Sequence, residues 1–104
     1  MEEEFILDPG DVPDGGALVV GEEDPIAVFN IGGEYFAIED TCPHADFSLA
    51  EGFLEGSVVE CPGHFATFDV TTGRALSPPT PRDAVACSVE VRGGRIHIRR
   101  SKSR

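Results

Sequence analysis

Hydrophobic and polar residues alternate over short stretches of this chain, and glycine or proline separates most of these stretches. A period of two residues predicts β-strands with one buried face. No long stretch shows the 3.6-residue period of an amphipathic helix. The strands that we expect cover residues 4–7, 17–20, 26–31, 34–39, 57–60, 67–70, 87–92 and 95–99. The pattern therefore predicts an all-β protein.

Two glycine pairs and one ligand-rich loop indicate which strands pair. Gly32-Gly33 and Gly93-Gly94 each stand between two expected strands, and adjacent glycines suit the tight turns of hairpins. Residues 57–60 and 67–70 flank a loop and are also expected to pair. In the last hairpin Cys87 shares one face with Val89 and Val91, so we expect it to be a small buried apolar residue. His97 should point outward as a surface residue and not as a ligand.

Length and composition favour one domain spanning residues 1–104,. Twelve glycines and eight prolines fit a loop-rich β protein. No segment has the apolar length of a membrane span, and the acidic start Met1-Glu2-Glu3-Glu4 is unlike a secretory signal. Two of the three cysteines are candidate ligands, which leaves no disulfide pair and predicts a cytoplasmic protein,. The basic tail, residues 99–104, should be frayed.

Charge is divided unevenly along the chain. All eight basic residues lie at or after Arg74, whereas seventeen of the nineteen acidic residues precede it. The acidic face around residues 46–69 should attract basic partner proteins and disfavour nucleic acid. Ordinary solubility from acidic loops is the other interpretation.

Candidate metal ligands occur in two short motifs separated by sixteen residues: Cys42-Pro43-His44 and Cys61-Pro62-Gly63-His64. Each motif offers one thiolate and one imidazole from a tight turn, because proline fixes φ directly after the cysteine. Two such turns suit a [2Fe–2S] centre with cysteines on one iron and histidines on the other. A mononuclear zinc site and a set of incidental cysteines and histidines remain the alternatives at this stage.

Residues 42–73 resemble the Rieske iron–sulfur motif, most closely that of the small ferredoxins serving bacterial aromatic-ring-hydroxylating dioxygenases. The matching residues are Cys42, His44, Leu49, Gly52, Leu54, Glu55, Gly56, Val59, Glu60, Cys61, Pro62, His64, Phe65, Phe68, Thr72 and Gly73. The resemblance implies a small Rieske fold, an antiparallel β-sandwich or barrel with a cluster-binding subdomain at about residues 41–82. It also implies that the proline-rich residues 77–81 cover the cluster, although composition alone fits a simple rigid connector as well.

Departures from the respiratory, high-potential members of this family imply a low potential. Phe47 and Gly63 stand where those proteins carry two further cysteines, so no disulfide joins the loops. Ala66 and Phe68 stand where they carry hydroxyl donors. Fewer hydrogen bonds to sulfur stabilise the reduced cluster less, so we expect a potential of roughly −150 mV.

The resemblance implies an electron carrier and not an enzyme. A flavin-containing NAD(P)H reductase would supply single electrons, which would pass to a Rieske non-haem-iron oxygenase that dihydroxylates an aromatic compound. Cys42 and Cys61 would anchor the buried iron of one [2Fe–2S] cluster, and His44 and His64 the outer iron. We expect a monomer. The alternatives are a small subunit of a nitrite reductase type enzyme and a zinc-binding interaction module.

Overall fold

Two antiparallel sheets make up the part of the chain that the structure, a computed structural model, describes: residues 2–42, 47–63, 66–76 and 82–101. The strands are β1 (Glu2–Leu7), β2 (Ala17–Val20), β3 (Ile26–Ile31), β4 (Glu34–Glu39), β5 (Phe53–Glu55), β6 (Val58–Glu60), β7 (Thr67–Asp69), β8 (Ala86–Arg92) and β9 (Arg95–Ser101). Two short 3₁₀ helices are η1 (Pro9–Asp11) and η2 (Leu49–Glu51). The predicted all-β fold class is confirmed.

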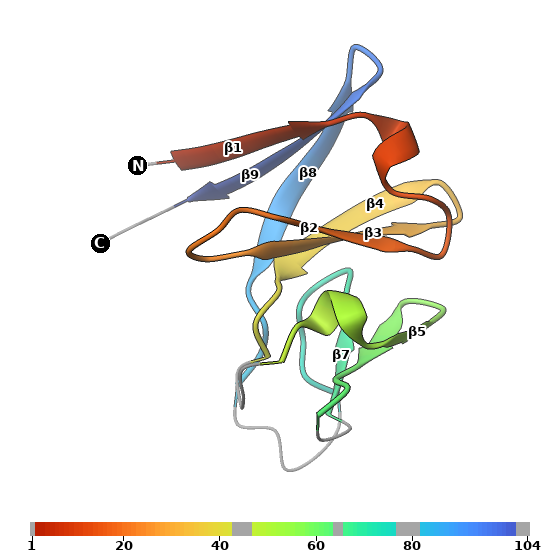
Figure 1. The fold of residues 1–104 in the computed structure, drawn as a ribbon, viewed down its shortest axis with the longest axis vertical. Helices are drawn as coiled ribbons and strands as arrows, with labels where there is room; N and C mark the ends of the chain where they lie inside the picture. The colour runs from red at the N-terminus through yellow and green to blue at the C-terminus, as the bar shows by residue number, and fades with distance from the viewer. Residues whose placement is uncertain (1, 43–46, 64–65, 77–81, 102–104) are drawn as a thin grey trace.

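The larger sheet has six strands in the order β1-β9-β8-β4-β3-β2, and the smaller has three in the order β5-β6-β7. Figure 1 shows the smaller sheet and η2 together at one end of the molecule, away from the chain termini. Strand β3, which lies between β4 and β2, is buried over its first five residues. Both of its faces are therefore covered, and each face contributes to a different hydrophobic core.

One core, here called the sheet core, lies within the six-stranded sheet; its buried residues are Val12, Ile26, Val28, Ala37, Ile96 and Ile98. The other, here called the cysteine core, joins that sheet to the smaller one; its buried residues are Ala27, Phe29, Ile38, Cys42, Leu49, Val59, Cys61, Ala66, Phe68, Val70 and Ala84. Successive side chains of a strand point to opposite faces. For this reason Ile26 and Val28 enter the sheet core, whereas Ala27 and Phe29 enter the cysteine core.

Most expected strands appear within two residues of their predicted ends, and the predicted pairing of β6 with β7 is confirmed. Both predicted glycine turns have positive φ at each glycine, 62° and 93° at Gly32 and Gly33 and 60° and 76° at Gly93 and Gly94. The alternation did not predict β5 or either 3₁₀ helix, each of which is three residues long.

The prediction that residues 99–104 fray is wrong for Arg99 to Ser101, which belong to β9. This strand pairs along its length with β1 at the opposite end of the chain. Arg100 is 7% exposed, and its Nη1 donates to the carbonyl of Asp24 at 2.7 Å. Its Nη2 lies 2.5 Å from Oε1 of Glu3. Because the acidic first strand partners the basic last one, the tail up to Ser101 is ordered.

The last hairpin matches its predicted alternation only in part. Cys87 and Val89 are half-buried against the sheet core, and burial raises the pKa of the Cys87 thiol to about 11,. Val91, near the turn, is instead 58% exposed. His97 lies on the polar face as predicted, but its side chain is only 14% exposed because Nδ1 lies 3.3 Å from Oε2 of Glu4.

Candidate metal centre

Cys42 begins a turn three residues after the end of β4. Its backbone N–H donates to the carbonyl of Phe47 at 2.9 Å, and Thr41 forms a bridge with Ser48. These two contacts place Thr41 and Cys42 beside Phe47 and Ser48. Cys42 itself is 2% exposed, so its thiol is buried where the turn begins.

Asp40 braces this turn, and the sequence reasoning did not single it out. The carboxylate Oδ1 of this 5% exposed residue accepts hydrogen bonds from Ser48 Oγ at 2.8 Å and from the N–H of Ala50 at 2.9 Å. Its carbonyl accepts the N–H of Leu49 at 2.7 Å. A buried carboxylate with several donors is an effective cross-link. One signal in the sequence could have indicated this role, namely the position of Asp40 directly after an expected strand.

Cys61 begins a second turn of the same construction. It follows β6, is fully buried, and donates its backbone N–H to the carbonyl of Ala66 at 2.7 Å. In both turns the cysteine N–H thus binds the carbonyl five residues later. Pairing of β6 with β7 sets the span of the second turn, as the bridge to Ser48 sets that of the first.

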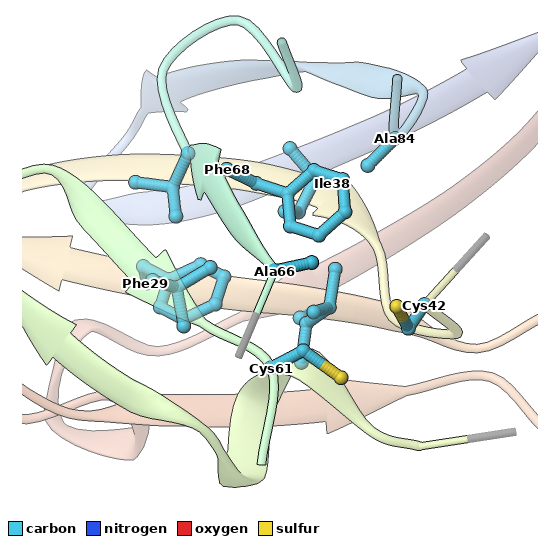
Figure 2. Close-up of a cluster of buried hydrophobic side chains, with 11 residues drawn as sticks. Phe29, Ile38, Cys42, Cys61, Ala66, Phe68 and Ala84 are labelled. Atoms are coloured by element: carbon cyan, nitrogen blue, oxygen red, sulfur yellow. The ribbon is translucent and has the colours of Figure 1, made fainter. Parts of the chain in front are cut away.

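Both cysteines belong to the cysteine core and are free of disulfides. Figure 2 shows them at the same margin of that core, beyond Ala66 and Phe68. Neither of these two side chains carries a hydroxyl group that could donate a hydrogen bond to sulfur. The surroundings are apolar and closely packed, which suits a metal–thiolate centre protected from water.

The structure brings together two of the four predicted ligands. His44 and His64 lie outside the described residues, as do residues 77–81, which were expected to cover the cluster. The described residues contain no cluster of three or more histidine, cysteine, aspartate or glutamate side chains suited to a metal. Two buried thiols on matching turns nevertheless have the chemistry of the cysteine half of a [2Fe–2S] site. The two described donors fit this half of the cluster.

Aromatic and aliphatic residues near the turns divide into two groups. Leu49 and Phe68 are fully buried, and Leu54 packs against the same core. These residues suit an apolar layer that keeps water away from the two thiols. Phe47 and Phe53 are instead 44% and 68% exposed.

Comparison with known proteins agrees with this geometry. Residues 4–92 match the model of the Rieske [2Fe-2S] domain. The 3-phenylpropionate/cinnamic acid dioxygenase ferredoxin subunit of Escherichia coli K12 is 46% identical over 89 residues, which cover 85% of this chain and 84% of that protein. The protein of Shigella boydii serotype 4 with the same name is 45% identical over the same length.

Solved structures give the same result. A chain of the complex of reduced oxygenase and oxidised ferredoxin in carbazole 1,9a-dioxygenase superimposes with a TM-score of 0.85 at 35% identity, covering 91% of both chains. The Sphingomonas yanoikuyae B1 ferredoxin gives 0.84 at 30% identity, covering 92% of this chain and 96% of that one. A putative nitrite reductase small subunit from Mycobacterium tuberculosis also reaches 0.85, but at 17% identity that likeness shows the fold alone.

The chain belongs to the Rieske [2Fe-2S] domain family. Within that family it is a ferredoxin, an electron-transfer component and not a catalytic subunit. Its cofactor is a Rieske-type iron–sulfur cluster. In the part of the chain that the structure describes, no helix has the length and apolar character needed to span a membrane.

Proposed function

We propose that this ferredoxin carries single electrons from a flavin-containing NAD(P)H reductase to a Rieske non-haem-iron oxygenase that dihydroxylates an aromatic compound. The observation that carries the proposal is the pair of buried thiols on matching turns, in a chain 46% identical to a dioxygenase ferredoxin subunit. A [2Fe–2S] centre accepts and releases one electron at a time, which is the chemistry that such a carrier needs.

The ligand set that we propose is Cys42 and Cys61 on the inner iron, and His44 and His64 on the outer iron. Burial supports the two cysteine ligands, because both thiols lie within the cysteine core. Sequence spacing supports the two histidine ligands, since each histidine follows its cysteine by two or three residues. The histidines are neutral ligands, so electron entry is easier here than at an all-cysteine centre. Without hydroxyl donors at positions 66 and 68, the potential should be roughly −150 mV.

Charge favours a basic docking partner for the end of the molecule that holds the cysteines. At the other end the basic side chains of β8 and β9 face acids of β1 and of the loop after it. Arg92 and Arg99 lie 4.0 and 3.5 Å from Glu4, and Arg95 lies 3.5 Å from Asp8. These pairs neutralise the basic residues within the molecule. The chain keeps a net charge of −11, and Glu51, Glu55, Glu60 and Asp69 contribute to it near the ligand turns. These acids would steer a basic protein surface.

The same charge distribution makes nucleic acid an unsuitable partner. We also propose that the protein acts as a cytoplasmic monomer. Three cysteines that form no disulfide, two of them fully or almost fully buried, suit a reducing compartment,.

Electron paramagnetic resonance of the dithionite-reduced protein, with iron and sulfide assays, tests the proposal. We expect a rhombic signal with an average g well below that of an all-cysteine cluster. Replacing His44 or His64 with alanine should abolish it, whereas His97→Ala is the matched control and should leave it intact. For the cysteines, Cys61→Ser should remove the cluster and Cys87→Ser should not.

Three outcomes would contradict the proposal. A colourless protein that contains zinc would indicate the interaction module. A protein that cannot be reduced on its own and is recovered only within a larger reductase would favour the nitrite reductase type of subunit. A reducible Rieske protein that fails to support a dioxygenase reconstituted with its reductase would leave the cluster assignment intact but refute the proposed partners.

A further inference from the structure

Phe47 connects the two ligand turns. Its backbone belongs to the first turn, because its carbonyl accepts the N–H of Cys42 at 2.9 Å. Its ring lies against the second turn at Gly63. A Cβ atom placed on Gly63 would overlap three ring atoms of Phe47, namely Cδ2, Cε2 and Cζ. The ring therefore occupies the space that any side chain at position 63 would need.

The ring, and not the backbone, explains the glycine at position 63. Gly63 is absent from the glycines with positive φ, so its backbone conformation is open to other residues. Gly56, which does have positive φ, shows the opposite case, since a Cβ there would meet nothing within 4 Å. Gly63 is thus a site of close approach, where a flat aromatic ring packs directly on the main chain.

Phe47 is 44% exposed, so the remainder of its surface is covered by the fold. An apolar ring so placed shields part of the second turn from water while its own outer side remains wet. No disulfide can replace this contact, because neither position carries a cysteine. Van der Waals packing holds the two turns together at this point.

We propose that Phe47 is a positioning residue of the cluster site, whose ring holds the Cys61 turn against the Cys42 turn. This inference rests on the proposed function, because it takes both turns to be ligand turns. The ring fixes the spacing of the two thiols and excludes water beside Gly63. Removing it should loosen the cluster and admit solvent, and a more solvated cluster has a more positive potential.

The experiment compares Phe47→Ala with Phe53→Ala, an exposed phenylalanine of β5, in protein purified with its cluster. Three quantities are measured: the reduced-state resonance spectrum, the midpoint potential and the rate at which visible absorbance is lost in air. For Phe47→Ala we expect shifted g values, a more positive potential and about tenfold faster loss of the cluster. Phe53→Ala should match the wild type in all three.

Gly63→Ala supplies an independent test through a double-mutant cycle. Alone, it should displace the ring and reproduce the three changes. Combined with Phe47→Ala, it should add little, because the ring that it would displace is already gone. Additive effects of the two substitutions would overturn the proposal, since they would show that the residues act separately.

Two further results separate the possible failures. A wild-type protein without a Rieske spectrum would refute the proposed function, whereas a normal spectrum, potential and stability in Phe47→Ala would refute only the positioning role. If Phe47→Ala retains too little cluster to measure, Phe47→Leu takes its place, because leucine fills part of the space above Gly63. We then expect smaller changes of the same sign, and wild-type values would overturn the proposal.

Discussion

The six-stranded sheet and the region that carries the ligand turns are stabilised in different ways. Strands of the larger sheet are four to seven residues long and pair with their neighbours in regular register, except for a short contact between β4 and β8. The strands of the smaller sheet are three residues each. Much of the ligand region consists instead of turns closed by single backbone hydrogen bonds and by the side chain of Asp40.

This difference indicates which region depends on its cofactor. Three-residue strands contribute few ladder hydrogen bonds, and small sheets need packing against another layer to be stable. The cysteine core supplies that packing through Phe29 and Ile38 of the larger sheet. Metal ligation adds to it, because a bound cluster links turns distant in the sequence. We therefore expect loss of the cluster to loosen the ligand region first and the six-stranded sheet later.

Gly52→Ala should give the largest effect, because it disturbs the ligand region through its backbone. A Cβ on Gly52 would overlap the carbonyl oxygen of Glu60, the residue directly before Cys61. Backbone cannot move aside as a side chain tip can. We expect the free energy of unfolding to fall by about 2–3 kcal/mol. The measurement is urea denaturation followed by visible absorbance for the cluster and by far-ultraviolet circular dichroism for the strands.

Gly10→Ala is the matched control for this substitution, since a Cβ on Gly10 meets nothing within 4 Å and its φ is not positive. It should leave both transitions unchanged. If Gly52→Ala lowered the two transitions of the ligand region and the sheet equally, the two regions would form one cooperative unit, and the comparison above would be wrong.

Arg100→Met should destabilise the six-stranded sheet and leave the ligand region unchanged, which is the reverse of the pattern expected for Gly52→Ala. This side chain is buried among the strand ends, where it contacts Glu3 and the carbonyl of Asp24. Removing it leaves these partners short of a donor, which should lower the free energy of unfolding by about 2 kcal/mol. Arg100 also lies 3.9 Å from Glu39, the last residue of β4, but none of these contacts is made with a residue of the ligand turns. Denaturation should therefore show a less stable sheet, while the resonance spectrum and potential remain those of the wild type.

Arg95→Met provides the comparison for Arg100. Its ion pair with Asp8 is exposed, with side-chain exposures of 61% and 66%, and such pairs contribute less than about 1 kcal/mol. We expect almost no change in stability. A potential altered by Arg100→Met would show that the strand ends and the cluster site are coupled, contrary to the division proposed here.

The sequence predicted the regular part of the fold well because local patterns determine it. Alternation located the strands of the larger sheet, and adjacent glycines located two turns. Pairing of β1 with β9 was missed, since it joins residues at opposite ends of the chain. A signal did exist: the acids Glu3 and Glu4 and the basic residues Arg99 and Arg100 have opposite charges. Instead the basic residues were interpreted as a frayed tail.

The sequence predicted the ligand residues of the candidate site but not the contacts that hold its two turns in place. Cys42 and Cys61 were found from their motifs, and the structure buries both in one core. His44 and His64 remain predictions. The brace at Asp40 could not be deduced from spacing, because it depends on how separate turns approach one another. The contact of Phe47 with Gly63 had a signal in the resemblance, since these residues stand where other members of the family carry the two cysteines that join the loops. That signal did not show that an aromatic ring packs on the glycine.

Cys87→Ala should give the smallest effect and appear only at alkaline pH. Burial raises the pKa of the Cys87 thiol to about 11 from its ordinary value of 9.0, with Arg100 opposing the shift and Glu39 adding to it. The unfolded chain therefore releases this proton at lower pH than the folded one. The contribution of the neutral thiol to stability is complete below pH 9 and is lost as the pH rises through 11.

In the wild type this should produce a loss between pH 8 and 10.5 that Cys87→Ala lacks. Solvent screening of the half-buried thiol reduces this loss to about 1 kcal/mol,. The measurement is the difference in urea-unfolding free energy between the two proteins at each pH, which cancels the contribution of every group that both proteins contain. Because Cys87 packs on the sheet core and not on the cysteine core, the loss should occur in the transition of the sheet. A loss confined to the visible absorbance would instead place the titrating thiol among the ligands, and Cys87 would no longer serve as a control for Cys42 and Cys61.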